Sequence, residues 1–150
     1  MCGRVHCTLT PLAILKLLGL QMFLNSDLFS PRYNIGPQSY LPAVRSNDSE
    51  AKDVVEKTTV VNSEKSSNKK IVESMKWGFF NQSGLVINAR IEDVHHRSMF
   101  KGIMNTQRCV VPINGYYEWK RESDALRPYY ICDKKKSTMM LGGKRLNRFV

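Results

Sequence analysis

The second half of the chain contains a series of short runs rich in β-branched and aromatic residues, and these runs constrain the fold most. They span 75–80, 85–89, 109–112, 116–120, 128–132 and 138–141. Runs of this kind, bounded by turn-forming residues, predict β-strands. Their close spacing favours an antiparallel or mixed sheet. Between two of them, Asn114-Gly115 predicts a tight hairpin turn.

Two helices are expected outside this sheet. The first begins at Thr10, whose hydroxyl can cap a helix that has Pro11 in its first turn, and it continues through the apolar positions of 12–23. The second is expected over 92–105. Helices packed outside a sheet of closely spaced strands give an α+β fold class.

The length of 150 residues predicts a single domain over 1–150. Residues 46–70 are polar, and we expect a flexible loop there that contains a short strand at 58–61. The longest apolar run, 12–20, contains Lys16 and is far shorter than the roughly 20 residues of a membrane-spanning helix. We therefore expect no membrane association.

The chain is strongly basic. Its 23 Lys and Arg residues against 13 Asp and Glu residues give a formal net charge of +10. Residues 101–150 hold 11 of these basic residues and 4 of the acidic ones, a net charge of +7. Such an excess favours a polyanionic partner, because phosphates are bound mainly by Lys and Arg. The alternative explanation is that the charge only keeps the protein soluble.

The four cysteines, Cys2, Cys7, Cys109 and Cys132, are too sparse and irregular for a disulfide scaffold. We expect free thiols in a reducing, intracellular compartment. A zinc site built from Cys2, His6 and Cys7 is an alternative, but these residues lack a C-x-x-C pair. We therefore expect no bound metal.

Cys2 carries the most specific chemistry. Initiator Met is commonly removed before a small residue, which would leave an α-amine and a thiol on adjacent carbons. An α-amine titrates at about pH 8 and a free thiol at about pH 8.5, so both are partly nucleophilic at neutral pH. The amine can condense with an aldehyde to an imine, which the thiol closes into a five-membered thiazolidine. Alternatively, the thiol attacks an amide with the amine as its base, or Cys2 is simply a small second residue.

Other residues could complete such a site. Gly3 lets the backbone approach a substrate closely, and Arg4 adds a positive charge suited to a phosphate. Asn88 ends a predicted strand and could orient a substrate or the terminal amine, while Arg90 could hold a further phosphate. The plain structural alternatives are a turn residue for Asn88 and a surface cation for Arg90.

Glu118 lies in the block 108–119. Strand alternation puts Tyr116 and Glu118 on one face and Tyr117 and Trp119 on the other. If the first face is buried, Glu118 is a carboxylate at the floor of a pocket that could shuttle a proton. An exposed strand glutamate is the commoner alternative.

Five motif blocks, taken in order, resemble the SOS response-associated peptidase (SRAP) family. They are Cys2-Gly3-Arg4, Arg32-Tyr33-Asn34-Ile35-Gly36-Pro37, Met75-Lys76-Trp77-Gly78, Asn88-Ala89-Arg90 with Glu92, and Arg108-Cys109 through Trp119. The resemblance runs from Cys2 to about Gly142. It implies a compact α+β domain built around a curved, barrel-like sheet with a positively charged groove.

The resemblance also implies a sensor of abasic sites in single-stranded DNA. In the family, the N-terminal Cys joins the aldehyde of the ring-opened abasic sugar as a stable thiazolidine, a DNA–protein crosslink that shields the lesion. The peptidase label reflects removal of the leading Met and an inferred autoproteolytic character. No cofactor is implied. We expect a monomer, in the nucleus of a eukaryote or in the cytoplasm and nucleoid of a bacterium.

The resemblance assigns roles to individual residues by matching position. Cys2 would be the crosslinking nucleophile, Asn88 would orient the terminus and the sugar, and Glu118 would handle protons. Four residues would contact DNA, two by gripping phosphates and two by lining the groove: Arg4 and Arg90, and Pro37 and Trp77.

The chain departs from the family pattern near its end. None of its histidines lies in the family's H-x-R-M-P segment, and the usual Gly-Leu-Trp does not follow Gly142. We therefore expect a member truncated at its C-terminus, whose sheet has an unpaired edge.

Two alternative functions remain open. A glutamine amidotransferase with an N-terminal nucleophile also begins Met-Cys-Gly, but its other motifs are absent and it does not predict a charge of +10. A catalytically inactive single-stranded DNA-binding fragment would keep the groove without the chemistry, with 134–136 following the backbone. Three consecutive lysines are more often a solvated hairpin tip.

Overall fold

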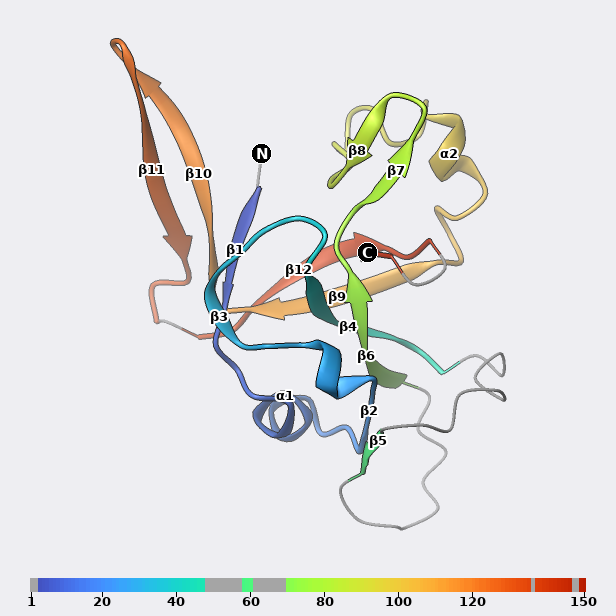
Figure 1. Ribbon diagram of the computed structural model, residues 1–150. Coiled ribbons are helices and arrows are strands. Elements are labelled where there is room, and N and C mark those ends of the chain that lie inside the picture. The colour runs from blue at the N-terminus through green and yellow to red at the C-terminus, as the bar shows by residue number, and fades with distance from the viewer. Residues whose placement is uncertain (1–2, 48–57, 61–69, 136, 147–148) are drawn as a thin grey trace.

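The computed structural model describes residues 3–47, 58–60, 70–135, 137–146 and 149–150 (Figure 1). The largest sheet has six strands in the spatial order β12 (Met139–Lys144), β9 (Arg108–Ile113), β4 (Tyr40–Ser46), β6 (Lys70–Lys76), β2 (Met22–Leu24) and β5 (Thr58–Val60). Strands β2 and β6 pair in parallel, and the other neighbours pair antiparallel.

A second sheet has four antiparallel strands in the order β11 (Ala125–Cys132), β10 (Gly115–Glu122), β1 (Arg4–Cys7) and β3 (Arg32–Ile35). The remaining elements are the hairpin of β7 (Phe79–Asn81) and β8 (Gly84–Val86), the helices α1 (Pro11–Leu18) and α2 (Ser98–Lys101), and the short 3-10 helix η1 (Ser26–Leu28). Mixed sheets with few helices confirm the expected α+β class. The described strands leave the sheets open and do not close a barrel.

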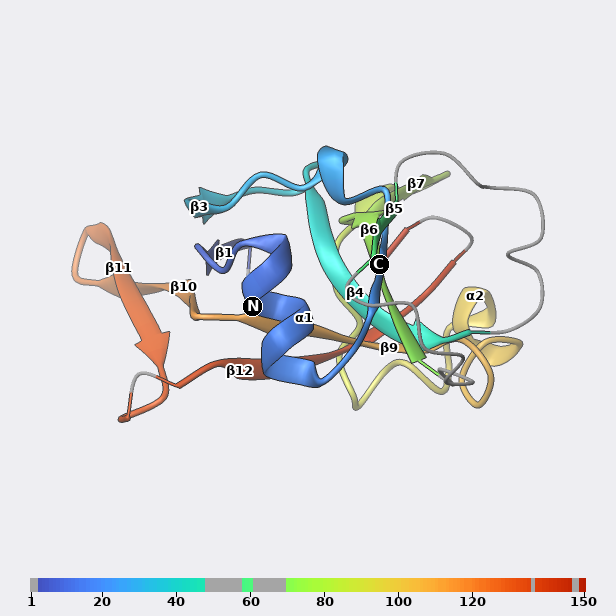
Figure 2. The same ribbon diagram turned by 90° about the horizontal axis from the view of Figure 1, so that it is seen from below.

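Both large sheets and α1 contribute to one hydrophobic core. Ile14 and Leu15 of α1 are buried in the same cluster as Val5 of β1, Phe23 of β2 and Ile113 of β9. Seen from below, α1 lies in front of the strands (Figure 2). The helix therefore covers this end of the molecule.

The start of α1 confirms the prediction from Thr10-Pro11. The Thr10 hydroxyl accepts a hydrogen bond from the Ala13 amide at 3.2 Å, as an N-cap should. The helix ends sooner than the apolar pattern suggested. Gly19 adopts a left-handed φ of 63°, and the chain then enters β2.

The long second helix predicted over 92–105 is wrong. Only α2 is helical there, and 91–96 form turns. The buried side chains of this segment include Val94 and Phe100. These lie six positions apart, whereas a helix buries residues three or four positions apart. The segment therefore lacks the apolar stripe that would hold a longer helix against the core.

The hairpin turn predicted at Asn114-Gly115 is also wrong. Strand β9 pairs with β12 and β4, whereas β10 pairs with β1 and β11, so the chain passes from one sheet to the other at Asn114. A two-residue hairpin turn needs positive φ at its first residue (type II′) or at both (type I′), and neither Asn114 nor Gly115 has it. Instead the Asn114 amide donates to the His6 carbonyl at 2.8 Å, and the Asn114 side-chain oxygen accepts from the Thr8 amide at 2.8 Å.

Strands β4 and β6 pair with each other, although charged residues in both interrupt the apolar run that would predict a strand. Arg45 on β4 and Glu73 on β6 are buried, and the Arg45 Nε lies 2.5 Å from a carboxylate oxygen of Glu73. The Arg45 guanidinium also donates to the Ser46 carbonyl at 2.8 Å. A buried charge needs such partners.

The predicted flexible loop over 46–70 lies mostly outside the described residues, but β5 confirms a strand at 58–60.

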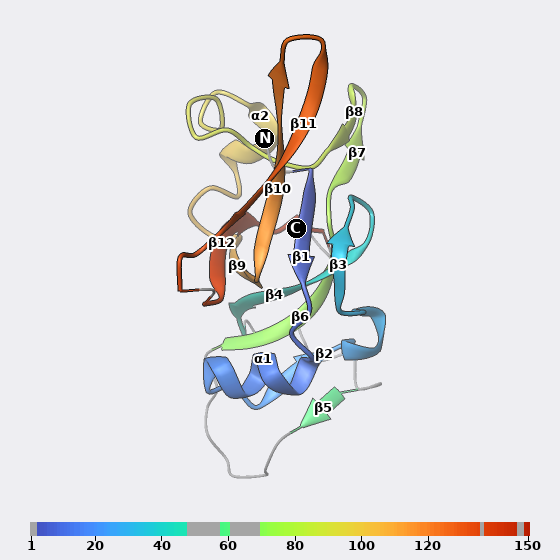
Figure 3. The same ribbon diagram turned by 90° about the vertical axis from the view of Figure 1, so that its left-hand side faces the viewer.

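The two hairpins project from the same end of the molecule (Figures 1 and 3). One is β10–β11 and the other is β7–β8. The N-terminal end of β1 points in the same direction, between the two hairpins as Figure 1 shows them. The fold therefore places the N-terminal end of β1 at the end of the molecule where both hairpins project.

Close packing at Gly115 generates the first testable prediction. A Cβ atom built on Gly115 would lie 2.5 Å from the Tyr130 hydroxyl oxygen and 2.7 Å from the Ile131 carbonyl oxygen. By contrast, a Cβ built on Gly142 of β12 would meet nothing within 4 Å. We expect Gly115→Ala to lower the free energy of unfolding by about 2 kcal/mol because Tyr130 and the β11 backbone must move.

Urea unfolding followed by circular dichroism measures this difference. The control variant Gly142→Ala should change the free energy of unfolding by less than about 0.5 kcal/mol. Equal effects of the two substitutions would contradict the close approach of Tyr130 to β10.

Candidate nucleic-acid interface

The pairing of β1 with β10 positions the start of the chain. Arg4 lies opposite Tyr117 in an antiparallel register. Gly3, which precedes Arg4, therefore lies next to the part of β10 that continues with Glu118. Cys2, the predicted nucleophile, lies outside the described residues, and Gly3 is half-buried.

Arg4 is exposed, and its side chain lies over the turn that follows β3. A Cβ built on Gly36 would be 3.1 Å from a guanidinium nitrogen of Arg4. A larger residue at position 36 would thus push the guanidinium away. The structure brings Arg4 and the turn that contains half-buried Pro37 together, as two of the predicted DNA-contacting residues require.

Hydrogen bonds hold this turn against the segment after β6. We call this connection between 38–39 and 77–78 the clamp. The Gln38 amide donates to the Trp77 carbonyl at 2.7 Å, and the Trp77 amide donates to the Ser39 carbonyl at 2.8 Å. The Gln38 side-chain amide donates to the Gly78 carbonyl at 2.8 Å. Gln38 has a left-handed φ of 67°, which is uncommon for a residue with a side chain. Sequence reasoning missed Gln38, because neither its backbone conformation nor its partners can be read from neighbouring residues.

Trp77 extends the clamp to the chain that carries Asn88. Its side chain is 6% exposed, and its indole N–H donates to the Ile87 carbonyl at 2.9 Å. Gly78 has φ +80°, and a Cβ there would lie 2.8 Å from the Ile87 side chain. A buried indole does not offer its face to a base. The role that the structure supports for Trp77 is therefore to position Ile87 and the residue after it.

Asn88 and Arg90 follow β8, just beyond Ile87, whose carbonyl accepts from the Trp77 indole. Asn88 is half-buried and Arg90 is exposed. The Arg90 carbonyl accepts from the amides of Asp93 and Val94 at 3.1 and 2.9 Å, which turns the chain directly after Arg90. The structure therefore links Arg4, the Pro37 turn and Asn88 through one series of contacts.

Glu118 lies on the opposite face of the four-stranded sheet from Arg4. It alternates with Tyr116, which pairs with the buried Val5 and packs against the core. Glu118 is half-buried. The predicted alternation of β10 is thus observed, with Glu118 on the core-facing side and Tyr117 on the other. Arg4 and Glu118 therefore lie near Gly3, on opposite faces of the sheet.

Of the other three cysteines, two have buried thiols that are poor nucleophiles, and one is exposed. Burial raises the pKa of both Cys7 and Cys109 to about 11, so these thiols stay protonated at neutral pH. Cys132 is exposed at the end of β11. Cys132 is therefore the control against which reactivity at Cys2 must be tested.

The positions of Cys7 and His6, the two described residues of the alternative zinc site, do not support it. Cys7 points into the core and donates to the Pro112 carbonyl at 3.5 Å, while its neighbour His6 lies on the other face of β1. Across the described ranges, no group of three or more His, Cys, Asp or Glu side chains is placed to hold a metal ion. In the same part of the chain, every helix is too short or too polar to cross a membrane.

Comparison with known proteins identifies relatives along almost the whole chain. The family model described as SOS response associated peptidase (SRAP) matches residues 1–145. The abasic site processing protein HMCES of Xenopus tropicalis is 29% identical over 153 residues, which cover 87% of this chain and 42% of that protein. The abasic site processing protein YobE of Bacillus subtilis is 23% identical, over 81% of this chain and 50% of that protein. The chain thus spans half or less of the length of these relatives.

Two solved structures share the fold. A phage-related protein of Bordetella bronchiseptica superimposes with a TM-score of 0.64 at 22% identity, over 95% of this chain and 60% of that one. A protein of Bacteroides thetaiotaomicron gives a TM-score of 0.66 at 16% identity, over 94% of this chain and 58% of that one. At these identities the likeness concerns the fold alone. Because the family model matches residues 1–145 of 150, the chain belongs to the SOS response associated peptidase (SRAP) family.

Proposed function

We propose that this chain processes abasic sites in single-stranded DNA by trapping the sugar aldehyde at Cys2 after Met1 is removed. The observation that carries the proposal is the placement of Gly3 and of the N-terminal end of β1. Arg4, the first residue of β1, pairs with Tyr117, the neighbour of Glu118 on β10, at the end of the molecule from which both hairpins project. Relatives named abasic site processing proteins support the choice of substrate.

The chemistry balances without a cofactor. The α-amine of Cys2 adds to the aldehyde carbon of the ring-opened sugar, and loss of one water gives an imine. The thiol sulfur then adds to the imine carbon, and the thiol proton ends on the nitrogen. The product is a thiazolidine, which holds the sugar by one C–N and one C–S bond. A lysine amine can form only the imine, which water reverses.

The neighbouring residues have distinct roles in this proposal. Glu118 accepts a proton from the terminal ammonium and returns one to the departing hydroxyl, as a general acid–base. Asn88 orients the terminus and the sugar through its side-chain amide. Arg4 and Arg90, both exposed, contact the phosphates on either side of the lesion through charge-assisted hydrogen bonds. Pro37 lines the path of the DNA on the turn beneath Arg4.

The second prediction tests the nucleophile. Met-trimmed protein mixed with an oligonucleotide that holds one abasic site should give an adduct that survives denaturing electrophoresis. Cys2→Ser should lose at least about 90% of this adduct, because a hydroxyl closes the imine poorly, whereas Cys132→Ser should keep it. An oligonucleotide with intact bases should give none.

Other outcomes of that experiment favour the alternatives. Full adduct formation by Cys2→Ser would contradict the proposal. Hydrolysis of glutamine without any need for DNA would favour the amidotransferase. Salt-sensitive binding of DNA with no adduct by the wild-type chain would leave only a DNA-binding fragment.

The third prediction concerns the clamp. Trp77→Phe keeps a buried ring but removes the donor to the Ile87 carbonyl, so Asn88 is held less well. We expect the single-turnover rate of adduct formation to fall roughly tenfold, because small misplacements of catalytic groups cost rate steeply. The affinity for intact single-stranded DNA should stay within about twofold.

Trp119→Phe is the matched control, since Trp119 is 44% exposed on β10 and phenylalanine keeps an aromatic ring at that position. Its rate should stay close to that of the wild type. If Trp77→Phe lowers the urea midpoint but leaves the rate unchanged, Trp77 is only a core residue and the positioning role is contradicted.

A further inference from the structure

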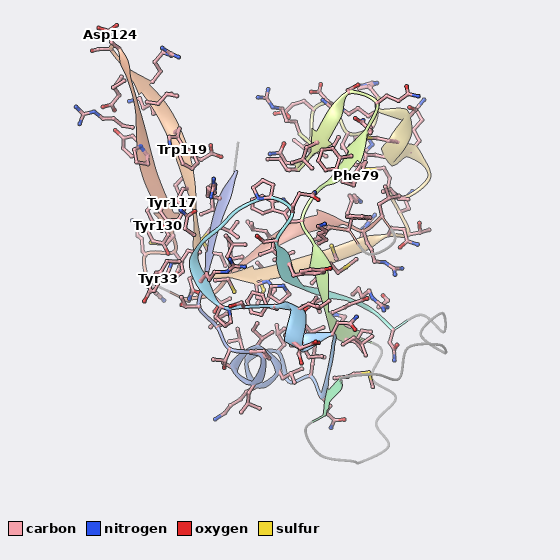
Figure 4. All side chains as sticks on the ribbon, in the orientation of Figure 1. Tyr33, Phe79, Tyr117, Trp119, Asp124 and Tyr130 are labelled. Atoms are coloured by element: carbon pink, nitrogen blue, oxygen red, sulfur yellow. The ribbon has the colours of Figure 1, made fainter. Side chains whose placement is uncertain are left out.

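The outer face of the four-stranded sheet carries four rings, each in contact with the next, which we call the aromatic row. The row consists of Tyr33, His6, Tyr130 and Tyr117, from four different strands. The centroids of His6 and Tyr33 are 4.7 Å apart in a stacked arrangement, those of His6 and Tyr130 are 5.6 Å apart, and those of Tyr130 and Tyr117 are 5.2 Å apart. Figure 4 shows Tyr117, Tyr130 and Tyr33 following one another along one side of the sheet.

The row faces away from the hydrophobic core. Val5 and Cys7, which alternate with His6 on β1, are buried on the opposite face. Tyr33 is 70% exposed and Tyr130 is 44% exposed. The row is therefore an open aromatic surface.

Hydrogen bonds hold the row in place. Burial lowers the pKa of His6 and raises that of Tyr130, so His6 is neutral and Tyr130 is protonated near pH 7. The Tyr130 hydroxyl then donates to His6 Nδ1 at 2.7 Å, and His6 Nε2–H donates to the Thr8 hydroxyl at 3.2 Å. The Thr8 hydroxyl donates in turn to the Asn114 side-chain oxygen at 3.3 Å. Each donor in this series meets an acceptor, and the series ends at the corner between the sheets.

Gly115 makes this arrangement possible. It lies between His6 and Cys132 in the sheet, and the Tyr130 side chain crosses the space that a Cβ at this position would occupy. The ring can therefore lie across β10 and reach His6. The surface is preformed, so a ligand that stacks on it needs little rearrangement of these side chains.

The two faces of this sheet carry different charged residues. The strand positions on the row's face include Arg4 and Arg121 and, among the described residues, no Asp or Glu. Both glutamates of β10 lie on the other face. There Glu122 pairs with Lys120 and Arg127 at 3.5 and 3.3 Å. The row's face therefore suits a partner that combines flat rings with negative charge.

We propose that the aromatic row binds bases of single-stranded DNA by stacking, next to the site where the lesion is held. Bases stack on exposed aromatic side chains whatever their sequence, while arginines follow the phosphates. Arg4 pairs with Tyr117, so the row begins directly beside the candidate phosphate ligand. The inference rests on the proposed function for its choice of single-stranded DNA, and it adds a second contact region on the outer face.

Neighbouring tyrosines provide a matched test. Tyr130 and Tyr129 are 44% and 45% exposed and lie on opposite faces of β11. Tyr129 donates to Glu122 on the other face. We would measure binding of a fluorescent oligothymidine with intact bases to the full chain by anisotropy, in a Cys2→Ser background that excludes crosslinking.

We expect Tyr130→Leu and Tyr33→Leu each to weaken binding about tenfold, because leucine keeps apolar area but offers no ring for stacking. Tyr129→Leu should bind within about twofold of the parent, and Tyr33→Trp should restore full affinity. Tyr33 is the outermost ring, so its variants test stacking even if Tyr130→Leu unfolds.

Several results would overturn the inference. One is unchanged affinity in Tyr33→Leu, and another is equal weakening by Tyr129→Leu and Tyr130→Leu. If the row variants instead convert a dimer to a monomer in sedimentation without altering DNA binding, the face joins two copies of the chain. Adduct formation by the Cys2 protein is measured separately, so failure of the row and failure of the crosslink can be told apart.

Discussion

The pairing of β1 in the middle of the four-stranded sheet is the interaction on which the rest of the structure depends. Because β1 has β10 on one side and β3 on the other, the position and direction of the strand that begins at Arg4 are fixed by pairing on both sides. Successive side chains of this short strand point to opposite faces of the sheet. Val5 and Cys7 enter the core, while Arg4 and His6 face outward. One strand thus anchors the fold, carries a candidate phosphate ligand and supports the aromatic row.

A second constraint is the close approach of backbone segments around Trp77. The turn after β3 is hydrogen-bonded to the chain after β6, and the Trp77 indole is bonded to the chain after β8. Glycine is required at 78, where φ is +80° and a Cβ would lie 2.8 Å from the Ile87 side chain and 2.9 Å from the Val86 carbonyl oxygen, whereas a Cβ at 36 would displace only the end of the Arg4 side chain. These contacts tie the residues beside the N-terminus to those around Asn88, although they are far apart in sequence. The proposed chemistry needs that tie, because both ends of the sugar must be held at once.

Local features of the fold could be predicted from sequence, and long-range ones could not. The Thr10 cap and the strands from β9 to β12 follow from residue type and short spacing. Strand β1 has no such signal, and Asn114-Gly115 resembles a hairpin although its partners, His6 and Thr8, lie more than 100 residues away. The same holds for the site. The proposed reactivity of Cys2 rests on two adjacent functional groups, whereas the burial of Trp77 and the contact of His6 with Tyr130 depend on tertiary pairing.

The most direct test is the mass of the intact crosslinked species, followed by mapping of the linked peptide. The account predicts a mass equal to the chain without Met1 plus the oligonucleotide minus one water, with the sugar attached to a peptide that begins at Cys2. A species that retains Met1, or a sugar attached through a lysine, would contradict it.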